Sequence, residues 1–210
     1  MNWCWLNNTQ IIYGINCIKD FFHTLISPKS KILCLFGDCF TDIKSFKISE
    51  CFLDIQSNLQ EMQCSVKWED LHCSTQHENE CIFPDYDRLI EIITVVKKEN
   101  PDLIIAVGDQ AAINGTKFVA MAAQIPDDLD PWEAIVVKNT NFKDHLKFSC
   151  IITNLTNGSE WNSTFAITRQ IHSEKVLFRG RDFPTFPVFS IIDRKYIMKM
   201  GIDNIKSNIF

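Results

Sequence analysis

Residues 103–118 read LIIAVGDQAAINGTKF, and this stretch decides the fold of the chain. Its first five residues are apolar and have the length of a buried strand. Gly108 makes a tight turn, after which the pattern predicts a helix that includes Phe118, Val119, Met121 and Ala122. The unpaired backbone N–H groups at the start of such a helix suit an anion such as a nucleotide phosphate. Phosphate loops use several glycines, whereas only Gly108 stands here before Asp109 and Gln110.

The rest of the chain alternates in the same way. Apolar runs of strand length, which are typical of parallel strands covered on both faces, occupy residues 32–36, 148–152 and 188–192. Helices are expected at residues 15–25, 48–59 and 85–100, the last capped by Asp85 and ended by Asn100-Pro101. Residues 164–168 and 175–178 predict a β-hairpin. The sequence therefore predicts an α/β fold with a mostly parallel, Rossmann-like sheet, flanking helices and a small β-hairpin.

Composition excludes several classes of protein. A net charge of −5 offers no basic surface to nucleic acid or to an anionic membrane. No apolar stretch approaches the ~20 residues that cross a bilayer, and the N-terminus lacks the basic start of a signal peptide. We therefore expect a cytoplasmic protein that binds neither nucleic acid nor membrane.

The cysteines do not indicate a metal or disulfide scaffold. There are nine of them, an odd number, and none forms a Cys-x-x-Cys pair. Residues 70–81 contain two histidines and two cysteines, so a metal site and a polar loop are both considered. Their spacing matches no structural zinc pattern, which favours the polar loop.

Several segments together resemble one family. In order and spacing, the stretch at 103–118 and residues 11–14, 32–37, 100–102, 130–132, 158–160, 186–187 and 191–193 are similar to the iron-containing alcohol dehydrogenases, especially the NADPH-dependent butanol dehydrogenase and aldehyde reductase branch. The resemblance implies NAD(P)-dependent interconversion of alcohols and aldehydes. It also implies a dehydroquinate synthase-like nucleotide-binding domain at residues 1–194, with residues 195–210 as the truncated start of a C-terminal all-helical metal-binding domain.

The first glycine turn of the family accommodates the adenosine end of the cofactor. NADPH-using members carry Gly-Gly-Gly-Ser there, and this chain carries Gly37-Asp38-Cys39-Phe40. A carboxylate at Asp38 would bond a ribose diol and repel a 2′-phosphate, which favours NAD over NADP. A cap of the following turn is an equally good interpretation of Asp38.

The second glycine turn of the family faces the cofactor pyrophosphate. Here it reads Gly108, Asp109, Gln110 and Ala111 in place of Gly-Gly-Gly-Ser. Side chains at positions that normally take positive φ cost about 1–2 kcal/mol each, and Asp109 adds repulsion of the phosphates. We therefore expect binding of NAD or NADP to be weak or lost. The family's aspartate near the nicotinamide is the neutral Asn114.

A third element matches the family's Thr-Leu-Pro-Ala-Thr-Gly-Ser-Glu at residues 153–160, with Asn157 in place of the second threonine. From this match, the residues assigned to the cofactor are Thr153, Thr156, Gly158, Ser159 and Asn162. Lys175 stands where family members direct a lysine to the cofactor ribose. The alternative for Lys175 is a polar residue on an exposed strand.

Family enzymes hold catalytic iron or zinc with an aspartate and three histidines of the helical domain. The match passes Asp193 and reaches Phe210, and the five histidines of the chain match no ligand position. We therefore expect no metal and no catalytic residue in this chain, which by itself would be a truncated or impaired form without activity. The alternatives are a non-catalytic pseudoenzyme or interaction module, paired as a homodimer or with full-length relatives, and a decaying coding sequence without a selected role.

Overall fold

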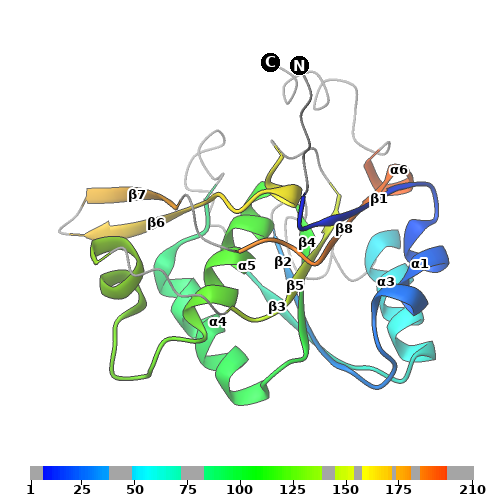
Figure 1. Cartoon of the computed structure of the whole chain (residues 1–210), viewed down its shortest axis with the longest axis horizontal. Helices are drawn as coiled ribbons and strands as arrows, with labels where there is room; N and C mark the ends of the chain where they lie inside the picture. Colours follow the sequence, from blue (N-terminus) through cyan, green and yellow to red (C-terminus); the bar gives the residue numbers. More distant parts are fainter. Residues whose placement is uncertain are drawn as a thin grey trace, which may run out of the picture.

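The computed structural model describes residues 7–37, 49–71, 83–138, 145–153, 158–171, 174–180 and 185–197. Its centre is a six-stranded sheet in the order β1-β8-β5-β4-β2-β3, in which every pairing is parallel (Figure 1). The strands are β1 (Gln10–Gly14), β2 (Lys31–Phe36), β3 (Ser65–Asp70), β4 (Leu103–Gly108), β5 (Phe148–Ile152) and β8 (Phe189–Asp193). The predicted α/β fold is confirmed.

Helices cover both faces of the sheet and create two apolar cores. One core contains side chains of α1 (Cys17–Leu25) and α3 (Glu50–Glu61). The other contains those of α4 (Tyr86–Glu99) and α5 (Gln110–Ala122). In α5, all residues from Ala111 to Ala122 are buried, so this helix is enclosed rather than amphipathic.

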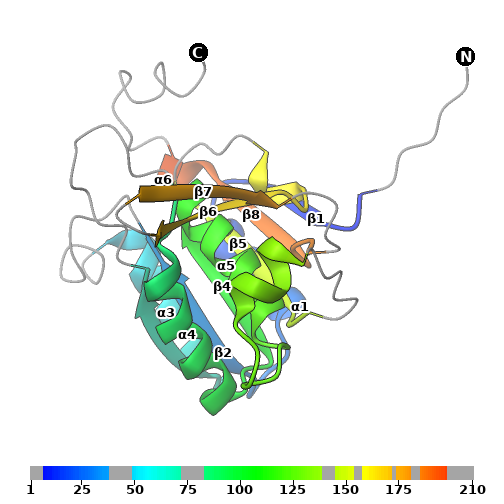
Figure 2. The ribbon, with the colours of Figure 1, turned by 90° about the vertical axis from the view of Figure 1, so that its left-hand side faces the viewer.

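A two-stranded antiparallel hairpin, β6 (Phe165–Ile171) and β7 (Glu174–Gly180), forms a second sheet beside α5 (Figure 2). It confirms the predicted hairpin. The remaining elements are short: the π-helix η1 (Glu133–Val137), the 3-10 helix η2 (Ser159–Trp161) and α6 (Arg194–Ile197).

The predicted helix ends are confirmed at α4. The Asp85 side chain accepts a hydrogen bond from the backbone N–H of Asp87 at 3.0 Å, as an N-cap does. Asn100 ends the helix in the left-handed conformation at φ 47°. None of the helices in the described part of the chain has the length and apolar character needed to cross a membrane.

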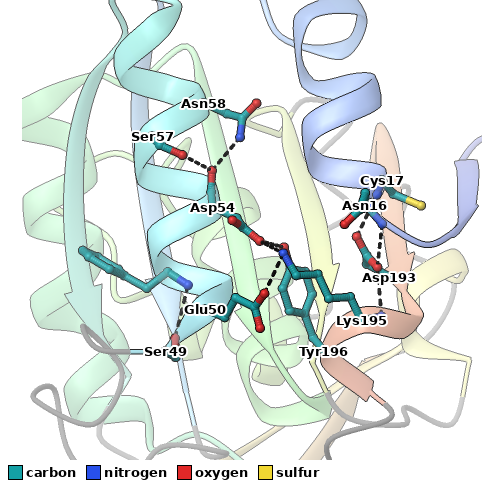
Figure 3. Close-up of polar contacts among 11 residues, drawn as sticks. Asn16, Cys17, Ser49, Glu50, Asp54, Ser57, Asn58, Asp193, Lys195 and Tyr196 are labelled. Atoms are coloured by element: carbon teal, nitrogen blue, oxygen red, sulfur yellow. Dashed lines mark hydrogen bonds and ion pairs between the residues drawn. The ribbon is translucent and has the colours of Figure 1, made fainter.

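Polar contacts connect the end of β8 to the start of α1, and the last described helix, α6, to α3 (Figure 3). The buried Asp193 carboxylate accepts hydrogen bonds from the backbone N–H groups of Asn16 (3.2 Å) and Cys17 (2.7 Å), at the start of α1. Asp54 of α3 accepts hydrogen bonds from Lys195 Nζ at 2.6 Å and Tyr196 Oη at 2.7 Å. The proposed start of a helical domain at residues 195–210 stays a prediction, since residues 198–210 lie outside the described ranges.

Candidate functional site

The turn between β4 and α5 depends on a close approach of two glycines. Gly108 has a φ of 144°, a conformation that side-chain-bearing residues rarely adopt. A β-carbon at Gly108 would lie 2.7 Å from the carbonyl oxygen of Gly37, which follows β2. Gly37 also donates its N–H to the carbonyl of Val107 at 3.3 Å. These two predicted site residues therefore lie together at the carboxyl ends of neighbouring strands, where ligands of α/β sheets gather.

Asp109 caps the helix that the nucleotide phosphate would approach. Its Oδ1 accepts hydrogen bonds from the backbone N–H groups of Ala111 at 2.9 Å and Ala112 at 3.4 Å. Burial raises the pKa of the Asp109 carboxyl, and the two N–H donors oppose part of that rise. A carboxylate of the chain itself thus uses the donors that bind phosphate in related folds.

The expected backbone strain at this turn is wrong. Asp109 has φ −104° and ψ −161°, which is extended backbone, and Gln110 and Ala111 are the first residues of α5. The expectation assumed that these residues keep the conformation of the glycines they replace. Aspartate is a strong N-cap, so the chain begins its helix here in ordinary backbone geometry instead. The predicted electrostatic conflict between Asp109 and a phosphate is a separate matter and stays a prediction.

A pocket of about 390 Å³ opens beside the start of α5, between the helix, η2 and the hairpin. Four of the predicted cofactor residues line it: Gln110, Asn114, Ser159 and Asn162. The other lining residues are Phe83, Thr164, Phe165, Ala166 and Arg179. Six of these nine described lining residues are polar and three are apolar, so the pocket offers a ligand hydrogen-bonding groups beside the apolar contact that small-molecule sites use.

Asn114 brings an unsatisfied donor to this pocket. Its side chain is 1% exposed, and its Nδ2 has no hydrogen-bond partner among the described residues. A buried amide without a partner costs about 1–3 kcal/mol, so such groups are ordinarily satisfied by protein, water or ligand. An acceptor oxygen of a ligand in the pocket would satisfy it.

Asn162 is oriented by a buried lysine. Lys117 of α5 is fully buried and donates to Asn162 Oδ1 at 3.0 Å and to the carbonyl oxygen of Thr164 at 2.8 Å. Asn162 Oδ1 also accepts from the Thr164 N–H at 2.8 Å. Because the oxygen receives both donors, the Asn162 amide nitrogen is the atom left to bond a ligand.

Burial lowers the pKa of Lys117 to about 8, because desolvation disfavours the ammonium form. Weak attraction to Cys150 and Glu160 opposes that shift. Lys117 therefore changes charge close to neutral pH, although no carboxylate within the described ranges forms an ion pair with it.

The other predicted residues are not among those that line the pocket, and some lie outside the residues that the structure describes. Thr153 is buried and donates its N–H to the Gly108 carbonyl at 3.0 Å. Gly158 precedes η2 with φ 81°. Asp38 and Thr156 lie outside the described residues, as does most of the histidine- and cysteine-containing segment at 70–81. Lys175 belongs to β7, where its backbone pairs with Gln170, and its side chain is not described.

Three polar residues of the site were not predicted. Arg179 and Thr164 reach the pocket from the hairpin and its approach, a contact between elements that sequence spacing does not reveal. Lys117 had a usable signal, since it is a charged residue within the apolar helix that ends the motif at 103–118. Within the described ranges, no three His, Cys, Asp or Glu side chains group around a possible metal position.

Comparisons with known proteins match the chain to one family. The family model for iron-containing alcohol dehydrogenases matches residues 9–194. The NADPH-dependent aldehyde reductase YqhD of Escherichia coli is 30% identical over 113 residues, which are 54% of this chain and 29% of that protein. NADP-dependent alcohol dehydrogenase 3 of Entamoeba histolytica is 26% identical over 213 residues, covering 100% of this chain and 50% of that protein. The chain therefore spans half or less of these relatives.

Solved structures show the same fold. The crystal structure of Escherichia coli YqhD has a TM-score of 0.74 at 21% identity, covering 99% of this chain and 49% of that one. NADH-dependent butanol dehydrogenase A of Thermotoga maritima also has a TM-score of 0.74 at 21% identity, with 97% and 47% covered. At this identity the likeness concerns the arrangement of the elements.

Proposed function

Because the chain belongs to the iron-containing alcohol dehydrogenase family, we propose that it is the nucleotide-binding half of an NAD(P)-dependent alcohol or aldehyde oxidoreductase, with weakened cofactor affinity. The supporting observation is the single pocket that collects Gln110, Asn114, Ser159 and Asn162 at the carboxyl ends of the strands. These residues came from separate segments of the family match, and they lie together around one cavity.

The pocket residues suit the nicotinamide half of the cofactor, whereas the start of α5 does not suit a phosphate. Asn114 offers an unsatisfied amide donor, and Asn162 an amide nitrogen that Lys117 leaves available. At the start of α5, in contrast, Asp109 already uses the N–H groups of Ala111 and Ala112. A bound nicotinamide would supply the hydride chemistry, while these side chains would bind and orient it.

No step through iron or zinc is derived, because the described residues contain no group of ligands for either metal. Any turnover would use metal ligands that these residues do not supply. For this chain we therefore propose binding of the dinucleotide, and we propose conversion of alcohols or aldehydes only for an enzyme that also contains the metal-binding domain.

Titration with NADH and NADPH, followed by nicotinamide fluorescence and calorimetry, tests this function. We expect weak but saturable binding, and its loss in Asn114→Leu, which removes the unpaired donor and has the same number of side-chain heavy atoms. No hydrogen bond to Asn114 Nδ2 is broken, so a fall in the melting temperature of this variant would report the packing cost of the bulkier leucine at this buried position. No binding by the wild type, together with none by Asp109→Ser, which removes the carboxylate from the helix end, would instead support the interaction module without cofactor.

A further inference from the structure

Arg179 is the one charged residue among the described residues that line the pocket. It belongs to β7, where it pairs with Ala166 of β6. Its side chain is exposed, and it forms no hydrogen bond or ion pair with another described residue. A guanidinium at the edge of a pocket is suited to bind a phosphate or carboxylate through two parallel hydrogen bonds.

The unpartnered amide of Asn114 is a second and independent sign of an acceptor-rich ligand. It belongs to α5, whereas Arg179 belongs to the hairpin, and both residues line the same cavity. The Asn162 nitrogen adds a third donor from the segment after η2. Three residues with donor groups, from separate elements, therefore line one cavity whose described lining contains no carboxylate.

In related folds an anion binds at the first N–H groups of the helix, which in this chain is the start of α5, before the pocket residue Asn114. The first N–H groups of α5 are occupied by the Asp109 carboxylate, directly before the pocket residue Gln110. The Asp109 carboxylate repels a phosphate from that end of the helix, whereas the Arg179 guanidinium of the hairpin attracts one. Asp109 is not among the described residues that line the pocket, and Arg179 is.

We propose that Arg179 anchors the phosphate on the nicotinamide side of the dinucleotide, in place of the helix end that Asp109 occupies. This inference rests on the proposed function, because it names the residue that selects the phosphate of the same ligand. Asn114 and Asn162 bond the neighbouring oxygens. Arg179 is thereby a specificity-determining residue, which favours phosphorylated over unphosphorylated nicotinamide ligands.

Two ligands that differ by one phosphate test the assignment. The full chain is titrated with nicotinamide mononucleotide and with nicotinamide riboside, and separately with NADH. Arg179→Met should raise the dissociation constants of the mononucleotide and of NADH at least about tenfold, the contribution of one charge-assisted hydrogen bond. Affinity for the riboside, which has no phosphate, should change less than about twofold. Arg179→Lys should restore part of the preference, since a point charge remains.

Lys19→Met is the matched control for the loss of one positive charge. Lys19 is exposed on α1, which belongs to the core on the opposite face of the sheet, and we expect unchanged affinity for all three ligands. The inference is overturned if Arg179→Met weakens the riboside as much as the mononucleotide, or weakens neither. Saturable NADH binding with either of those results would leave the proposed function intact. Absence of NADH binding to the wild type and to Asp109→Ser would overturn both this inference and the proposed function.

Discussion

Replacing Asp109 with serine should convert a weak dinucleotide site into a stronger one. The Asp109 carboxylate is bonded to two N–H groups at the start of α5, so a phosphate at that position would lie within about 4 Å of it. Two unit charges at that distance repel by about 1 kcal/mol in water and about 4 kcal/mol at the effective dielectric of a protein surface. Asp109→Ser should therefore improve NADH binding by about 1–3 kcal/mol, which is roughly 5- to 150-fold.

The substitution should have little effect on stability. Serine caps helices about as well as aspartate, and the loss of a charge near the helix end costs about 0.3–1 kcal/mol. Burial raises the pKa of the Asp109 carboxyl because desolvation disfavours its charged form. Removing the charge therefore also removes part of a desolvation cost, which limits the loss of stability. Chemical denaturation should show a change in the unfolding free energy below about 1 kcal/mol.

Asp85→Ser is the control for the assay by NADH fluorescence and calorimetry. Asp85 caps α4 through the N–H of Asp87 in the same way, and it does not line the pocket. It should leave NADH affinity unchanged. Equal NADH affinity in wild type and Asp109→Ser, or an equal gain in Asp85→Ser, would refute the argument that the Asp109 carboxylate blocks the phosphate.

Three further predictions concern stability. Gly108→Ala should destabilise the chain by about 1–2 kcal/mol or more in urea denaturation. Gly37→Ala should be tolerated, because its β-carbon would lie 3.7 Å from its nearest neighbours. Equal losses of stability in the two variants would contradict this prediction. Between about pH 8 and pH 10.5, the unfolded chain binds more protons at Lys117 than the folded one, so this residue makes stability rise with pH. Buried cysteine thiols with raised pKa make stability fall with pH in the same range, and they are present in both proteins compared. The test is therefore the unfolding free energy of the wild type minus that of Lys117→Met, and this difference should increase with pH through this window. Tyr196→Phe, which removes one hydrogen bond to Asp54, should cost about 1 kcal/mol, and an unchanged denaturation midpoint would show that Lys195 alone holds this contact.

The central fold could be predicted because its strands are buried on both faces. β2, β4, β5 and β8 are continuous apolar runs, and each lies where that pattern indicated. The two edge strands were not predicted. β1 and β3 are only partly buried, so polar residues such as those of Ser65–Asp70 interrupt the apolar signal.

The site was predicted only as far as residues could be matched to the family. The match located Asn114, Ser159 and Asn162, which line the pocket. It led to a wrong prediction of backbone strain at Asp109. The family's glycine was assumed to set the backbone conformation there, whereas aspartate adopts the extended conformation of an N-cap. It also could not reveal Arg179, whose place beside α5 depends on how the hairpin packs on the helix.

The enclosure of α5 separates two kinds of evolutionary freedom. Sheet, α4 and hairpin surround the helix, and every residue from Ala111 to Ala122 is buried, so almost any exchange there disturbs packing on several sides. Exposed side chains of the hairpin, such as Arg179, can be exchanged without disturbing that packing. Descendants of this sequence could therefore acquire new ligand preferences by changing the outer wall while the inner wall remained fixed.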